Sequence, residues 1–161
     1  PHLCEAGVKF TFAKHHILKP DYSKKMIPHF DMNPNVMVFS LFPGIQASIF
    51  GHVLDAPELK GVVMRSFGSG NAPQQPWLMR LLKDASERGV TIVNISQCGA
   101  GFVEMSRYDN GYQLKDTGVI SGHDCTVEAA VTKLMYLHGQ YEDTNIVREL
   151  MSKSLAGEIS I

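Results

Sequence analysis

The sequence predicts an α/β domain, a small three-layer fold of the flavodoxin-like or Rossmann-like type. It should hold a short parallel sheet of about four strands with helices on both faces. Short β-rich runs alternate with longer stretches of helical period, which is typical of this class. The runs are apolar throughout, as expected of strands that are buried on both faces. A length of 161 residues and a hydrophobic content of 44% fit one domain with its own core.

Three strands are expected at residues 36–41, 61–64 and 90–95. A helix at 45–54 follows Pro43-Gly44. A second helix carries an apolar stripe that ends before Gly89, a candidate glycine just beyond the helix; the stripe consists of Trp77, Leu78, Leu81, Leu82 and Ala85. This β-α-β-α-β order predicts right-handed crossovers that bring the three strands into one sheet.

The remaining third of the chain predicts a fourth strand and two helices. Residues 118–120 form a short β-branched run. The next helix should start at Asp124-Cys125-Thr126, because small polar residues cap helix N-termini, and it carries apolar residues on one stripe up to Leu137. A last helix should begin near Asp143.

The first 35 residues differ from the rest in composition. They hold five lysines against three acidic residues, together with prolines that break any long regular element. We expect residues 1–35 to be a connector with one short strand at 8–12, and residues 36–161 to be the folded domain.

Charge, hydropathy and cysteine content exclude several classes. Fifteen basic against sixteen acidic residues give a net charge of −1, which argues against binding to nucleic acid or to anionic membranes. No apolar run approaches the roughly 18 residues of a membrane span, and no signal peptide is apparent, so a cytoplasmic location is expected. Three cysteines, Cys4, Cys98 and Cys125, do not suggest a disulfide scaffold.

Ligands of open α/β sheets bind beyond the carboxyl ends of the strands, which directs attention to residues 42–44, 65–71 and 96–101. In the second segment, Gly68 and Gly70 permit close backbone approach and Arg65 offers a fork for a carboxylate or phosphate. A dinucleotide fingerprint is excluded, since Pro73 stands at its third glycine position. A free-standing module that holds a small anion at 68–71, or simply a tight turn with a surface arginine, are the alternatives.

The third segment places Cys98 directly after a strand. With His123 and Asp124 it could form the catalytic set of a cysteine hydrolase. Against this, a nucleophile elbow leads into a helix, whereas the residues after Gly101 have no helical period. A packed structural cysteine is the alternative.

Five motifs resemble those of one enzyme family, in the family's order and spacing. They are Leu41-Phe42-Pro43-Gly44-Ile45, Val63-Met64-Arg65-Ser66-Phe67-Gly68-Ser69-Gly70-Asn71-Ala72-Pro73, Ser96-Gln97-Cys98, Gly118-Val119-Ile120-Ser121-Gly122 and Asp124-Cys125-Thr126-Val127-Glu128-Ala129-Ala130. With them, residues 36–161 resemble the C-terminal domain of a bacterial type I, cytoplasmic L-asparaginase, and residues 1–12 resemble the stretch just after that family's catalytic domain.

The resemblance implies hydrolysis of L-asparagine to L-aspartate and ammonia by a threonine nucleophile, with no metal or organic cofactor. In the family the nucleophile lies in a Thr-Gly-Gly-Thr-Ile turn and is activated by a Thr-Asp pair and a lysine, all within the N-terminal domain. This sequence contains no Thr-Gly-Gly. We therefore expect this chain alone to be inactive, and residues 1–35 to link it to an N-terminal catalytic domain.

The resemblance also implies roles for individual residues. Arg65 and Cys98 match positions that line an asparagine effector site, with Ser66 and Ser96 as their neighbours. Asn71 matches a residue near a partner subunit's active site, and Tyr108 falls where some relatives place an acidic residue. The implied partners are L-asparagine, the N-terminal catalytic domain and further copies of the chain in a homodimer or homotetramer.

Overall fold

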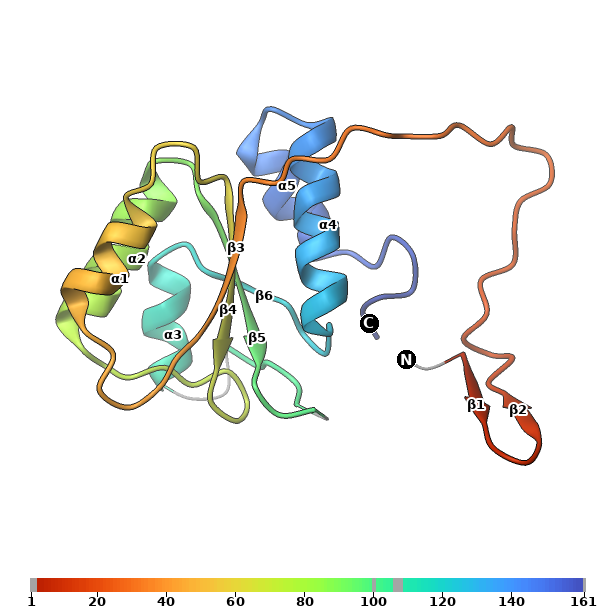
Figure 1. Cartoon of the computed structure of the whole chain (residues 1–161), viewed down its shortest axis with the longest axis horizontal. Helices are drawn as coiled ribbons and strands as arrows, with labels where there is room; N and C mark the ends of the chain where they lie inside the picture. The colour runs from red at the N-terminus through yellow and green to blue at the C-terminus, as the bar shows by residue number, and fades with distance from the viewer. Residues whose placement is uncertain (1–2, 100, 106–108, 161) are drawn as a thin grey trace.

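The computed structural model describes residues 3–99, 101–105 and 109–160. Its centre is a parallel sheet with the strand order β3-β4-β5-β6, formed by β3 (Val36–Ser40), β4 (Gly61–Ser66), β5 (Thr91–Ser96) and β6 (Ile120–Ser121). Helices α1 (Ala47–Leu54), α2 (Pro76–Glu87) and α3 (Asp109–Asp116) lie on one side of the sheet, and α4 (Val127–Gln140) and α5 (Thr144–Met151) lie on the other (Figure 1). The predicted α/β fold, with about four parallel strands and helices on both faces, is confirmed.

Alternating side chains of the central strands divide the core into two halves. On β4, Val62 and Met64 pack with residues of α1 and α2, whereas Val63 between them packs with α4 and α5. All three are fully buried. Since successive side chains of a strand point to opposite faces, Arg65 belongs to the α4 face and Ser66 to the α2 face.

The predicted helix starts are capped as the sequence indicates. The Thr126 hydroxyl accepts a hydrogen bond from the Ala129 amide (3.3 Å), and the Asp143 carboxylate accepts one from the Asn145 amide (2.8 Å). These bonds satisfy amides that a helix leaves without partners in its first turn. At the other end of α2, Gly89 follows the C-cap with a φ of 94°, as expected for a residue that ends a helix.

The region before β6 differs from the sequence-based expectation. The strand predicted at 118–120 is formed by Ile120 and Ser121, because Gly118 has a φ of 83° and closes a turn behind α3. Helix α3 was not predicted, since its residues show no continuous apolar stripe. Leu114, which is fully buried, connects it to the core.

The segment before the sheet carries a hairpin where one strand was predicted at 8–12. Strand β1 (Cys4–Ala6) pairs antiparallel with β2 (Phe10–Phe12), and the intervening turn includes Gly7. The hairpin stands apart from the sheet (Figure 1), and the chain returns to contact α4, where the Asn33 amide donates to the Met135 carbonyl (2.9 Å). Among the described residues, no helix has the length and apolar character that crossing a membrane requires.

A candidate ligand pocket at the carboxyl ends of the strands

A pocket of about 230 Å³ lies where the carboxyl ends of β4 and β5 meet the start of α4. Its walls include Arg65, Ser96, Cys98, Asp124, Thr126 and Glu128. The volume is below the roughly 300–1,000 Å³ of pockets for drug-sized ligands, which favours a ligand of amino-acid size. The location is the one that open α/β sheets use for ligands.

Arg65 lines this pocket with a positively charged side chain. Its side chain is half-buried, and its Nη1 donates one long hydrogen bond to the Ser40 hydroxyl (3.4 Å). The Nε atom is buried and has no hydrogen-bond partner, and within the described part of the chain no carboxylate forms an ion pair with the guanidinium. Because buried polar groups are nearly always satisfied, this guanidinium is suited to receive an anionic group from a ligand.

The loop after β5 is held rigidly beside Arg65. The Ser96 hydroxyl donates to the Gly68 carbonyl (2.6 Å) and accepts from the Cys98 amide (3.0 Å). Gly101 packs so tightly over this hydroxyl that a Cβ atom there would lie 2.0 Å from the Ser96 Oγ. Any larger residue at 101 would therefore displace the wall of the pocket.

Gln97 is a structural residue of the pocket that sequence reasoning missed. Its side-chain amide donates to the carbonyls of Leu41 (2.7 Å) and Arg65 (2.9 Å), so it joins the chain at the ends of β3, β4 and β5. The signal for it in the sequence is its position directly after a buried strand.

The structure brings together some of the predicted effector residues and separates others. Arg65, Ser96 and Cys98 line the same pocket. Ser66 does not, because it is fully buried on the opposite face of β4, where its hydroxyl donates to the Ile95 carbonyl (3.3 Å). Asn71 lies in the turn after β4 and pairs with Phe67. Tyr108 lies outside the described residues.

The turn at 68–71 is closed upon itself. The amides of Gly70 (3.1 Å) and Asn71 (2.8 Å) both donate to the Phe67 carbonyl, so neither is free for an anion. Gly70 has a φ of 104°, and a Cβ there would lie 2.7 Å from a methyl group of Val103. Backbone conformation and packing therefore explain why a glycine stands at position 70. This weakens the alternative of a module that holds a small anion at 68–71.

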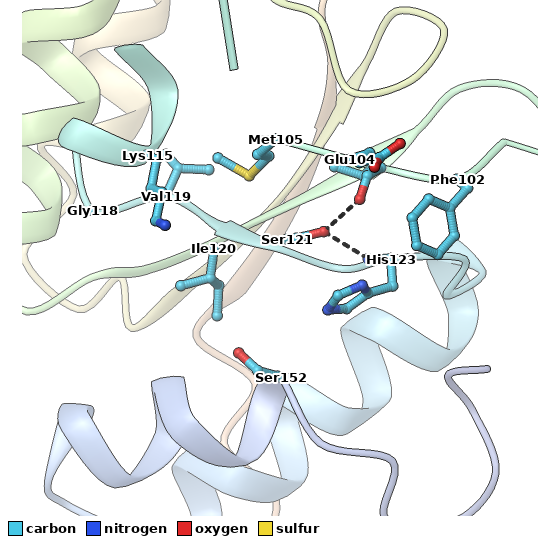
Figure 2. Close-up of a pocket in the computed structure, with 11 residues that line it drawn as sticks. Phe102, Glu104, Met105, Lys115, Gly118, Val119, Ile120, Ser121, His123 and Ser152 are labelled. Atoms are coloured by element: carbon cyan, nitrogen blue, oxygen red, sulfur yellow. Dashed lines mark hydrogen bonds between the residues drawn. The ribbon is translucent and has the colours of Figure 1, made fainter. Parts of the chain in front are cut away.

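The cysteine-hydrolase alternative finds no support in the geometry. His123 lines a different pocket, of about 410 Å³, where it lies beside Phe102 and Ser121 (Figure 2). Its Nδ1 is buried without a hydrogen-bond partner, and Cys98 lines the Arg65 pocket instead. Within the described residues no hydrogen bond joins the His123 ring to the Cys98 thiol, as activation of a thiol requires. Burial raises the pKa of the Cys125 thiol to about 11, so at neutral pH this thiol carries little of the nucleophilic thiolate form.

Asp124 contributes a negative charge to the Arg65 pocket. Burial alone would raise the pKa of this carboxyl group, but hydrogen bonds from the backbone amide and hydroxyl of Ser160 outweigh burial and hold the pKa below its ordinary value of 3.8. The amide donates to Oδ1 at 2.9 Å. The cysteine-hydrolase hypothesis groups Asp124 with Cys98 and His123. In the structure Asp124 shares a pocket with Cys98 and Arg65, and His123 lines another pocket.

Comparison with known proteins relates residues 35–151 of the chain to one family. Residues 35–151 match the model of the glutaminase/asparaginase C-terminal domain. L-asparaginase 1 of Escherichia coli (strain K12) is 39% identical over 166 residues, which cover 99% of this chain and 47% of that protein. Among solved structures, L-asparaginase I from Vibrio cholerae has a TM-score of 0.88 at 38% identity, and the thermostable L-asparaginase from Thermococcus kodakarensis has 0.81 at 29%. Each match covers 99% of this chain and 48% of the solved one, so the chain spans about half the length of these relatives.

Proposed function

Because this chain belongs to the glutaminase/asparaginase C-terminal domain family, we propose that it is the C-terminal half of an L-asparaginase. The complete enzyme would hydrolyse L-asparagine to L-aspartate and ammonia in the cytoplasm. In this proposal residues 1–35 link the domain to an N-terminal catalytic domain, and residues 36–161 make contacts in a homodimer or homotetramer. Asn71 and Tyr108 are proposed to face a partner subunit's active site.

The chain's own proposed role is to bind L-asparagine as an effector. One observation carries this proposal: at the wall of a pocket of about 230 Å³, the half-buried Arg65 guanidinium has no anionic partner among the residues that the structure describes. The α-carboxylate of an amino acid can accept two parallel hydrogen bonds from a guanidinium, a geometry that a lysine cannot offer. Ser96 and Cys98 would complete the walls around this group, whereas Ser66 would not touch the ligand.

An Arg65→Ala substitution should weaken the binding of L-asparagine by about ten- to hundredfold, because it removes a pair of charge-assisted hydrogen bonds worth roughly 1.5–3 kcal/mol. Calorimetric titration of both chains with L-asparagine measures the effect. Arg88→Ala is the matched control, since Arg88 pairs with Asp55 (3.1 Å) and does not line this pocket. Equal affinities for L-asparagine in the wild type and in the Arg65 variant would show that Arg65 does not bind the ligand.

This chain alone should release no ammonia from L-asparagine. The reason is that a hydrolytic centre needs a nucleophile with its base in reach, and the printed sequence has no Thr-Gly-Gly turn. A coupled ammonia assay with increasing protein concentration tests this expectation. Ammonia release that rises with the protein and disappears in a Cys98→Ser variant would instead favour the cysteine-hydrolase alternative.

A further inference from the structure

The segment 152–160 is pinned to α4 by a buried lysine. The Lys133 side chain is 5% exposed, and its ammonium group contacts the Glu158 carboxylate (2.6 Å), the Met151 carbonyl (3.1 Å) and the Lys153 carbonyl. Three contacts use all three protons of the ammonium group. Glu158 in turn accepts hydrogen bonds from the amides of Leu155 and Ala156, so its carboxylate also fixes the bend of this segment.

Beyond Glu158, the same segment reaches the ligand pocket. Ile159 is buried against the α4 side of the sheet, which fixes the direction of the chain. The amide of the next residue, Ser160, then donates to the Asp124 carboxylate at 2.9 Å. Asp124 lies in the pocket wall just before α4, so the segment braces one wall of the pocket from outside.

The braced carboxylate and Arg65 place opposite charges in one small pocket. No ion pair joins them in the described part of the chain, which leaves each charge able to meet a complementary group of a ligand. A ligand that satisfies both charges carries a carboxylate and an ammonium group a short distance apart. That pattern is the zwitterion of an α-amino acid.

We propose that Asp124 binds the α-ammonium group of the amino acid whose α-carboxylate binds Arg65, and that segment 152–160 acts as a brace that positions Asp124 through the Ser160 amide. This inference rests on the proposed effector site and assigns it a second recognition group. Ser160 is a positioning residue, because it acts on the ligand only through Asp124. Glu128 also lines the pocket but is exposed in the first turn of α4, where water screens its charge.

The test compares two probes that differ by one group. Succinamic acid has the carboxylate and side-chain amide of L-asparagine but lacks its α-ammonium group. Wild-type protein should bind L-asparagine about ten- to hundredfold more tightly than succinamate, since a charged hydrogen-bond partner is lost with the amine. Calorimetric titration gives the two affinities and hence their ratio.

Asp124→Asn removes the charge but keeps an oxygen that can accept from the Ser160 amide. It should reduce the ratio of the two affinities to near one, with succinamate affinity changed by less than about threefold. Glu128→Gln is the matched control for loss of a negative charge at the same pocket, and it should preserve most of the preference. A preference that Asp124→Asn leaves intact, or that Glu128→Gln lowers equally, would overturn the assignment.

The brace is tested at Ser160, an exposed position, so that the fold is spared. Ser160→Pro deletes the amide donor and should lower the preference for L-asparagine by at least about threefold, while Ser160→Ala keeps the amide and should lower it less. An unchanged preference in Ser160→Pro would overturn the bracing role. If segment 152–160 had only a structural role, Ser160→Pro would lower thermal stability without changing the ratio of the L-asparagine and succinamate affinities.

The results for the Arg65 and Asp124 variants can contradict the assignment of Asp124 without contradicting the effector site. If Arg65→Ala weakens both probes while Asp124→Asn leaves the ratio unchanged, the effector site stands and the ammonium assignment fails. If the wild type binds neither probe, the proposed effector site fails, and the assignment of Asp124 fails with it.

Discussion

A Lys133→Met chain should unfold with a free energy about 3–5 kcal/mol lower than that of the wild type. The substitution leaves the Glu158 carboxylate, whose side chain is 12% exposed, without its counter-ion. It also leaves the carbonyls of Met151 and Lys153 without a donor at the end of α5. Most of the cost comes from the charge left buried and unpaired, so methionine's similar length does not compensate. Urea denaturation monitored by circular dichroism measures the change.

Lys153→Met is the matched control for this variant. Lys153 pairs with Glu149 (2.5 Å), but both side chains are more than half exposed, so water screens the pair. Such surface pairs contribute about 0–1 kcal/mol. Equal losses of stability in the two variants would show that the three contacts of Lys133 contribute no more than a surface ion pair.

The same pair gives the stability a defined pH dependence. Burial on its own would raise the pKa of Glu158, but the Lys133 ammonium and the amides of Leu155 and Ala156 outweigh it and hold the pKa at about 2, against 4.5 ordinarily. A carboxyl group with a lowered folded-state pKa stabilises the fold above its unfolded pKa, and this contribution is lost as the pH falls toward the folded value. The stability difference between the wild type and Lys133→Met should therefore narrow from pH 4.5 to pH 2. A difference that stays constant over this range would contradict the assigned pairing.

The strands could be predicted from the sequence because they lie buried on both faces. Such strands leave continuous apolar runs, as at 61–64 and 90–95, and the structure places β4 and β5 there. Helix α3 could not be predicted in the same way, because its residues form no continuous apolar stripe. Of its side chains that the structure describes, at 113–116, Leu114 is the one in the core. The β1 strand was equally hidden, because its pairing with Phe10–Phe12 depends on a partner strand and not on burial.

For the pocket, the sequence could predict only the residues whose position follows from the geometry of the strands. Arg65 near the end of a buried strand predicts a guanidinium at the rim of the sheet, and the structure places it there. The same alternation puts Ser66 on the opposite face, so grouping it with Arg65 relied on sequence adjacency alone. Asp124 enters the pocket by a tertiary contact, held by an amide 36 residues later, which no local pattern encodes.

A Leu134→Ala chain should lose about 2–5 kcal/mol of stability, because the substitution leaves a cavity between α4 and the sheet. Leu134 is fully buried, and its side chain packs closely over Gly61, where a Cβ atom would lie 3.3 Å from Leu134 Cδ1. Around it lie Val63, Leu137 and Met151, from three different elements, and these cannot all move inward together.

Leu155→Ala supplies the same chemical change at a side chain that is 44% exposed, and it should cost less than about 1 kcal/mol. Urea denaturation of the two variants compares the same truncation at a buried and at an exposed side chain. The first turn of α4 forms part of the ligand pocket, so the helix must stay seated on the sheet for Asp124 and Arg65 to share one site. Addition of L-asparagine at about 100 times its dissociation constant should therefore return roughly 2.7 kcal/mol to the Leu134 variant, as it does to any form that retains the site. Equal losses of unfolding free energy in the two leucine variants would show that Leu134 does not pack between α4 and the sheet.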